Sequence, residues 1–88
     1  MKIETDIVAV KSTGTPKFAK GKIEEKNGGF ELSCKTGNTP QDVQTGEWIK
    51  KGDFSNLRDA IERSSQQDVF NRSITHTHPL WPAFENGR

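Results

Sequence analysis

The chain has 88 residues, of which 30% are hydrophobic and eight are glycine, and its formal net charge is +1. This length allows one domain and excludes a TIM barrel, a two-lobed enzyme and a complete Rossmann fold. The apolar share is below that of an ordinary globular chain, but the nearly balanced charge removes the self-repulsion typical of disordered chains. We therefore expect a small folded domain with a modest core.

Charges of both signs occur throughout the chain, which argues against a dedicated DNA-binding domain, because such domains are usually strongly basic. The single cysteine, Cys34, cannot form an intrachain disulfide. No apolar segment of the kind found in secretory signals or membrane spans follows Met1 and Lys2. We therefore expect a cytoplasmic protein that does not enter a membrane.

The first predicted element is a strand over residues 3–10. Its second half is β-branched, and its first half alternates so that one side carries Ile3, Thr5, Ile7 and Ala9. A run of turn-forming residues over 12–16 then ends the strand, and the chain resumes at Lys17.

A β-hairpin follows. The segments 18–25 and 30–35 alternate polar and apolar residues around Asn27-Gly28. Asn-Gly supplies the positive φ angles that a two-residue type I′ turn requires, and a turn at Gly28-Gly29 would give the same faces. The expected cross-strand partners are Ile23 and Leu32, Glu25 and Phe30, and Gly21 and Cys34. The face directed into the core consists of Ala19, Gly21, Ile23, Phe30, Leu32 and Cys34.

The segments after the hairpin give weaker signals. Residues 37–40 are turn formers and residues 41–46 are polar apart from Val43, so this segment predicts a surface loop. Residues 47–50 follow as a short strand, with Trp48 or Ile49 turned inward.

One main helix is predicted from about residue 54 to about residue 71, because apolar residues recur there at helical spacing. Asp53 or Ser55 can accept the free amide protons of its first turn. The apolar stripe weakens at residues 64–67, which indicates fraying, a kink or two shorter helices. Two ion pairs at i,i+4 spacing are expected on its solvent side, Asp59 with Arg63 and Asp68 with Arg72.

Residues 73–88 are predicted to form an extended or irregular tail, because Pro79 and Pro82 each fix φ and remove a hydrogen-bond donor. The tail either folds back over the domain of residues 1–72, which we favour, or is presented to another protein. The fold class is α+β, with a three- to four-stranded antiparallel sheet and one main helix packed on one face. The predicted core consists of Ile7, Ala9, Ile23, Phe30, Leu32, Cys34, Ile49, Leu57, Ile61 and Phe70.

Cys34, His76 and His78 are the residues that could support catalysis or bind a metal. Cys34 continues the inward row of the hairpin, where a thiol is inert, and two histidines make an incomplete metal site. No pair of carboxylates stands out for acid–base chemistry, and the glycine spacing does not fit a phosphate-binding loop. We therefore expect no catalysis, no cofactor and no metal ion, and a Cys–His enzyme is only the third hypothesis.

A basic segment runs from Lys11 to Lys22, with no acid between Asp6 and Glu24. Lysines there could neutralise phosphates while an aromatic ring stacks on a base, as in proteins that bind single strands or RNA. Nucleic-acid binding is therefore the second hypothesis, and its residues are Lys11, Lys17, Phe18, Lys20 and Lys22.

The leading hypothesis is a small adaptor, inhibitor or regulatory protein that binds a protein partner. An unpaired sheet edge or the apolar tail would make the contact, since exposed edges pair with other chains and tryptophan is enriched at interface hot spots. The tail residues assigned to this contact are His76, His78, Leu80, Trp81 and Phe84. The sequence leaves the choice between a monomer and a homodimer open.

Overall fold

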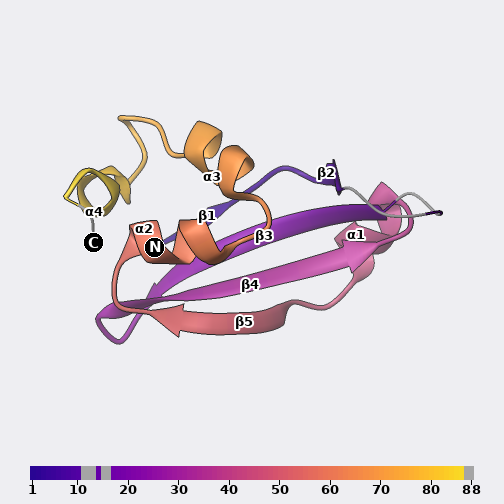
Figure 1. Ribbon diagram of the computed structural model, residues 1–88, viewed down its shortest axis with the longest axis horizontal. Helices are drawn as coiled ribbons and strands as arrows, with labels where there is room; N and C mark the ends of the chain where they lie inside the picture. Colours follow the sequence, from indigo (N-terminus) through magenta and orange to yellow (C-terminus); the bar gives the residue numbers. More distant parts are fainter. Residues whose placement is uncertain (11–13, 15–16, 87–88) are drawn as a thin grey trace.

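The computed structural model describes residues 1–10, 14 and 17–86, which form an α+β fold (Figure 1). The strands are β1 (Lys2–Glu4), β2 (Val8–Val10), β3 (Lys17–Lys26), β4 (Gly29–Gly37) and β5 (Ile49–Phe54). They make one antiparallel sheet in which β1 and β2 both pair with β3, β3 pairs with β4, and β4 pairs with β5. The helices are α1 (Pro40–Thr45), α2 (Leu57–Arg63), α3 (Gln67–Ser73) and α4 (Trp81–Glu85). The antiparallel α+β class is confirmed, whereas three or four strands and one main helix were too few.

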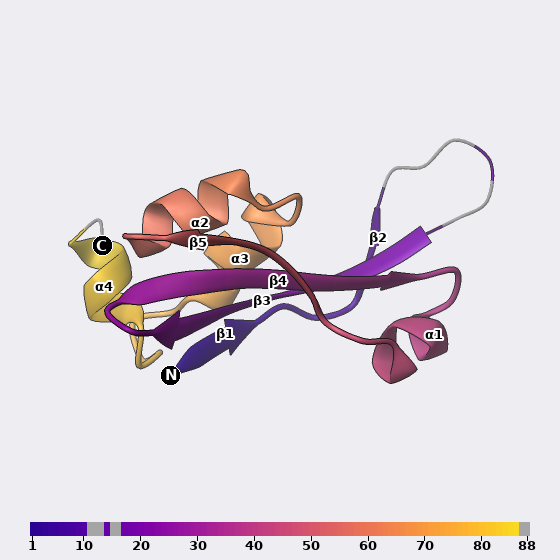
Figure 2. The same ribbon diagram turned by 90° about the horizontal axis from the view of Figure 1, so that it is seen from below.

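The two faces of the sheet carry different helices. α2 and α3 lie on one side, and α4 packs beside α2 near the turn between β3 and β4 (Figure 2). α1 contacts β3 and β4 from the opposite side, at the far end of the sheet. We call this second side, which no other helix of the described ranges covers, the open face.

The hairpin formed by β3 and β4 has the predicted register. Asn27 and Gly28 have φ angles of 51° and 79°, as a type I′ turn requires. The pairs Ile23–Leu32, Glu25–Phe30 and Gly21–Cys34 are all observed.

The single strand predicted over residues 3–10 is wrong, because the chain is interrupted between β1 and β2. Glu4 lies opposite Lys22 and Val8 lies opposite Ala19. The segment that joins β1 to β2 therefore contains one residue more than the stretch of β3 that it faces. At the interruption the Thr5 hydroxyl accepts a hydrogen bond from the Gly21 N–H at 2.9 Å. This extra residue changes which side chains face inward after Thr5.

The core lies between the sheet and α2, α3 and α4. A close approach centres on Gly21, where an added Cβ would stand 2.8 Å from two ring atoms of the fully buried Phe70. The buried cluster consists of Ile3, Ile23, Phe30, Leu32, Leu57, Ala60, Ile61, Phe70, Ile74 and Leu80.

Four residues of the predicted core lie outside it. Ile7 is only half-buried and Ala9 is exposed, because the interruption after Thr5 shifts the alternation. Cys34 is half-buried because it borders an open cavity beside residues 63–66, and its partner on β5, Ile49, is 57% exposed.

The predicted helix over residues 54–71 is also wrong in its start and its continuity. Phe54 belongs to β5, and the N-cap of α2 is Asn56, whose side-chain oxygen accepts a hydrogen bond from the Asp59 N–H at 2.8 Å. Of the alternatives for the polar gap at 64–67, two shorter helices are observed, with the Gln66 N–H donating to the Ser64 hydroxyl between them.

The predicted surface loop over residues 37–46 contains α1. Thr39 caps it by accepting a hydrogen bond from the Asp42 N–H, and Pro40 occupies a first-turn position where a missing N–H does no harm. The helix packs very closely on β4, since a Cβ at Gly37 would lie 2.7 Å from the Cβ of Asp42. Val43 is the buried residue that the loop prediction did not explain.

The C-terminal segment is not extended throughout. Ile74 and Leu80 are buried in the main core, and residues 81–85 form α4, in which Pro82 stands in the first turn. Proline is compatible with that position because the first N–H groups of a helix have no partner inside the helix. The N-cap residue of α4, Leu80, has its N–H satisfied from outside the helix, since it donates to the Nδ1 atom of His78 at 3.0 Å.

Candidate functional site

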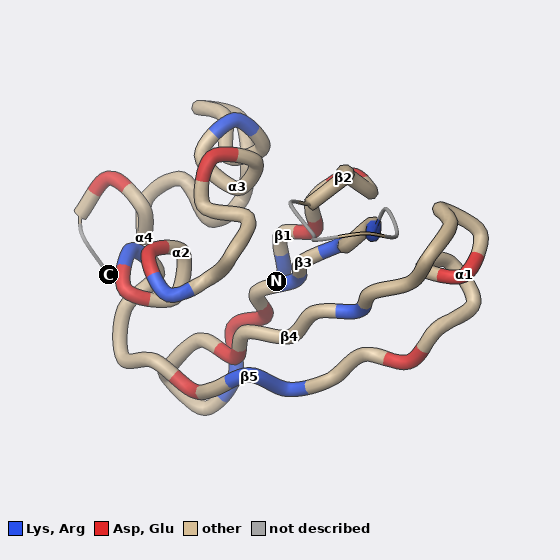
Figure 3. The backbone as a smooth tube through the Cα atoms, turned by 45° about the vertical axis from the view of Figure 1, so that its right-hand side comes forward, with Lys and Arg blue, Asp and Glu red and all other residues tan. Residues whose placement is uncertain are grey.

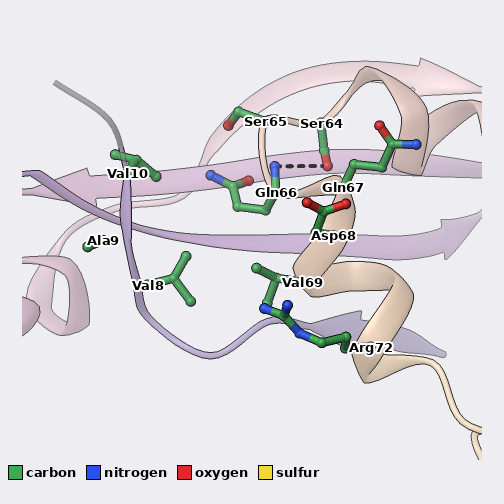
Figure 4. A pocket seen from close by; sticks show the side chains of 10 residues that line it. All are labelled: Val8, Ala9, Val10, Ser64, Ser65, Gln66, Gln67, Asp68, Val69 and Arg72. Carbon is green, nitrogen blue, oxygen red and sulfur yellow. Dashed lines mark hydrogen bonds between the residues drawn. The ribbon is translucent and has the colours of Figure 1, made fainter.

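A groove of about 660 Å³ separates β2 from the corner between α2 and α3 (Figure 4). Val8 and Val69 face one another across it. The remaining lining residues are Ala9, Val10, Ser64, Ser65, Gln66, Gln67, Asp68 and Arg72.

The groove exists because of the interruption in the first strand. α3 packs on β1, but the extra residue before Val8 makes β2 a separate strand, which pairs with β3. A bulge of this kind bends a strand and re-aims its side chains. The valines of β2 consequently face α3 across an open space instead of packing beneath it.

Gln66 lies at the base of this groove. It is only 4% exposed and occupies the N-cap position of α3, yet its side chain does not cap the helix. Its carboxamide has no hydrogen-bond partner among the described residues, and Figure 4 shows it directed toward β2. No fully enclosed side-chain N or O atom in the described part lacks a partner, so the small exposed area of Gln66 includes its polar atoms. The carboxamide therefore reaches solvent, and Gln66 lines both this groove and a second cavity beside Cys34.

The free edge of β2 presents backbone polar groups beside this carboxamide. The backbone groups of Gly21 and Glu25 on β3 form hydrogen bonds with Thr5 and Met1 of the N-terminal segment. Because backbone direction alternates along a strand, the groups of Ala19 and Lys17 point the same way and bond with Val8 and Val10 of β2. By alternation, the N–H and C=O of Ala9 point away from β3. Ala9 is exposed, and its methyl group is too small to block access to them.

The expected ion pair between Asp68 and Arg72 is not formed, and neither is that between Asp59 and Arg63. Asp68 and Arg72 both line the groove instead. The rim therefore carries one carboxylate and one guanidinium that no other described residue neutralises.

The tail residues assigned to partner binding are brought together only in part. His76 packs edge-on against Trp81 with ring centroids 4.4 Å apart, and Phe84 lies 5.4 Å from Trp81. The Trp81 indole N–H donates to Glu85, and the guanidinium of Arg58 lies 4.3 Å from the Phe84 ring. Leu80 belongs to the core, and His78 is half-buried with its Nδ1 accepting a hydrogen bond from the Leu80 N–H, so neither joins the group around Trp81.

The basic segment is also divided. Lys11 lies outside the described residues, and Lys17 is exposed at the start of β3. Phe18, Lys20 and Lys22 share the open face, because they alternate with the buried Ala19, Gly21 and Ile23. The charged positions along β3 and β4 are visible in Figure 3.

Ion pairs on the open face hold several of these lysines. Glu4 lies 3.1 Å from the Lys2 ammonium and 3.3 Å from the Lys20 ammonium. Burial raises the pKa of Glu4, but the hydrogen bonds from Lys2 and Lys20 outweigh it and leave the pKa below its ordinary value. At the hairpin turn, a hydrogen bond to Glu31 raises the pKa of Lys26.

Cys34 borders a cavity of about 320 Å³ together with Leu32, Lys51, Arg63 and residues 64–66, and this lining includes no histidine. Within residues 1–10, 14 and 17–86, no group of three or more His, Cys, Asp or Glu side chains is placed to hold a metal ion. The structure thus does not assemble Cys34, His76 and His78 into one site.

Sequence reasoning missed Gln66, Val69 and Arg72 as site residues. Their only signal was the interrupted apolar stripe, which indicates a break in the helix but not what faces it.

No family model matches the chain, and no curated protein or solved structure does so either. None of the helices in the described ranges is long and apolar enough to span a bilayer.

Proposed function

We propose that the protein is a non-catalytic interaction module that binds an extended segment of a partner protein in the groove between β2 and α3. The observation that carries this proposal is the buried carboxamide of Gln66, which has no partner among the described residues and is directed into the groove. The polar atoms of this carboxamide reach solvent, so a ligand would replace water at them with hydrogen bonds that each contribute about 0.5–1.5 kcal/mol net.

A polypeptide backbone is the ligand that fits these groups. A carboxamide can donate to a C=O and accept from an N–H at once, and an extended chain presents both. Ala9 offers a second such pair at the free edge of β2, the usual arrangement for strand addition. An apolar side chain of the bound segment would lie between Val8 and Val69.

The other sheet edge is less suitable. β5 carries Lys50 and Lys51 and has an irregular register opposite Leu32 and Ser33, features that discourage pairing with another strand. β2 carries only valine and alanine, so it lacks this protection.

The Trp81 region supports partner binding less well than the groove does. The polar atom of Trp81 and the face of Phe84 already have partners within the chain, Glu85 and Arg58. A hot-spot residue usually gains its contacts from the partner.

The test uses a displayed library of random linear peptides selected on the folded protein. The best peptide is then titrated against wild type, Gln66→Ala and Val69→Lys, with binding mapped by NMR on the ¹⁵N-labelled protein. We expect shifts at β2 and α3 and a loss of about ten-fold in affinity for Gln66→Ala, which corresponds to about two hydrogen bonds.

The matched control is Gln41→Ala, which removes an exposed glutamine from α1 on the other side of the sheet. It should bind the peptide as wild type does. Failure to enrich any peptide, or a selected peptide that binds Gln66→Ala and wild type equally, refutes the proposal.

A further inference from the structure

The open face carries a group of cations around one aromatic ring. Lys20 and Lys22 project from β3 and Lys35 from β4, and the indole of Trp48 lies beside them, just before β5. The ammonium of Lys22 is 4.7 Å and that of Lys35 is 4.8 Å from the ring centroid. We call Lys20, Lys22, Lys35 and Trp48 the basic cluster.

The basic cluster brings like charges to neighbouring positions of the sheet. Lys20 and Lys35 are directly opposite one another across the two strands, and like charges at such positions repel. The side chain of Lys20 is only 21% exposed, which reduces the screening of this repulsion by solvent.

The carboxylates of the described residues neutralise the lysines of the basic cluster only in part. Glu4 is 3.3 Å from Lys20 but is shared with Lys2, and Glu24 is 3.9 Å from Lys22 but is shared with Lys26. Lys35 has no carboxylate partner there. Its ammonium donates to the backbone carbonyl of Gln44 at 3.2 Å and lies against Trp48. The basic cluster therefore keeps a net positive charge.

We infer that the basic cluster binds single-stranded nucleic acid. The phosphates of a single strand complement the excess positive charge. When Lys22 and Lys35 turn from the Trp48 ring to these phosphates, an unstacked base can stack on that half-buried indole. Phe18 continues the same row on β3 and is half-buried, so a second ring is within the same face. Phe18 and Lys20 lie on the opposite face of β3 from Ala19 and Ile23, and α2 and α3 cover the Ala19 face, so they leave the Phe18 face uncovered. This site is independent of the groove, which lies on the other side of the sheet.

Fluorescence of Trp48 provides the test. In a Trp81→Phe background Trp48 is the only indole, and its emission is followed while oligothymidine is added. With three phosphates neutralised, affinity should fall about 20-fold between about 50 and about 200 mM salt. Trp48→Phe keeps a ring for stacking and should bind better than Trp48→Ala in an electrophoretic assay that needs no tryptophan.

Charge variants separate this site from general attraction to a cationic protein. Lys20→Gln and Lys35→Gln should each weaken binding and flatten the salt dependence, whereas Arg63→Gln, which removes the same charge from α2, should not. Circular dichroism verifies that each variant is folded. Binding that is independent of salt, equal weakening by Arg63→Gln, or equally tight binding of duplex DNA or polyglutamate overturns the inference, and none of these results bears on the groove.

Discussion

Replacing Gly21 by alanine should destabilise the fold by overpacking the core. Gly21 pairs with Cys34 in the middle of the hairpin, and a Cβ there would stand 2.8 Å from Cε2 and Cζ of Phe70 and 3.0 Å from Oε1 of Gln66. Overpacking of this kind is destabilising by about 1–3 kcal/mol, while the lower entropy of an unfolded alanine offsets about 0.4–1 kcal/mol. The net loss is therefore about 1–2 kcal/mol.

The assay is urea unfolding followed by tryptophan fluorescence, together with thermal melting. A loss of this size lowers the melting temperature by about 5–10 °C in a domain of this length. Gly52→Ala is the matched control, because its Cβ would meet only the edge of the Phe54 ring at 3.4 Å. We expect this control to be nearly neutral.

A double-mutant cycle identifies the cause. Phe70→Leu removes the ring atoms that the new methyl group would meet, so Gly21→Ala should be less damaging in that background than in wild type. Equal damage in both backgrounds, or a Gly21→Ala protein as stable as wild type, would refute the overpacking argument.

Three further predictions concern single sites. Asn56→Ala removes the side-chain cap of α2 and should lower the free energy of unfolding by about 1 kcal/mol in urea titrations; an unchanged midpoint would contradict a role for the cap. Gly28→Ala places a methyl group at a φ of +79° and should be destabilising by about 1 kcal/mol or more, although open space surrounds the site; a neutral result would show that the turn relaxes. The lowered pKa of Glu4 means that its ion pairs stabilise the fold above the pKa of the unfolded chain and lose that effect as pH falls through the folded pKa. As the pH is lowered below the ordinary glutamate pKa of 4.5, stability should therefore fall less steeply for Glu4→Gln than for wild type, and parallel curves would count against this assignment.

The hairpin could be predicted because its determinants are local. Asn27 and Gly28 set the turn, and the alternation on either side then fixes which side chains meet, as Ile23 and Leu32 show. Nothing from the rest of the chain is needed to choose this register.

The first strand and the main helix could not be predicted in the same way. The alternation of Ile3, Thr5 and Ile7 is consistent with one strand, and only pairing with β3 reveals the extra residue. Phe54 fits a helical stripe, but it is the last residue of β5 and pairs with Phe30 of β4. Tertiary pairing overrode local pattern in both places.

The site escaped sequence reasoning for a related reason. Gln66 reads as a polar residue in a weak stretch of helix, and its burial depends on how close α3 approaches Gly21. Trp48 and Lys35 are likewise far from Lys22 in sequence and meet only through the sheet. Lys20 and Lys22 were visible as part of a basic segment, but their proximity to Lys35 and to the Trp48 ring was not.

The extra residue between β1 and β2 also suggests how a deletion in the gene would alter the groove. A gene that lost the codon for Asp6 would leave Ile3 opposite Ile23 and Val8 opposite Ala19, with one uninterrupted strand joining them. The hollow beside α3 would narrow while the rest of the sheet kept its pairing. Deletion of a single codon would thus remove the groove between β2 and α3 without changing the fold.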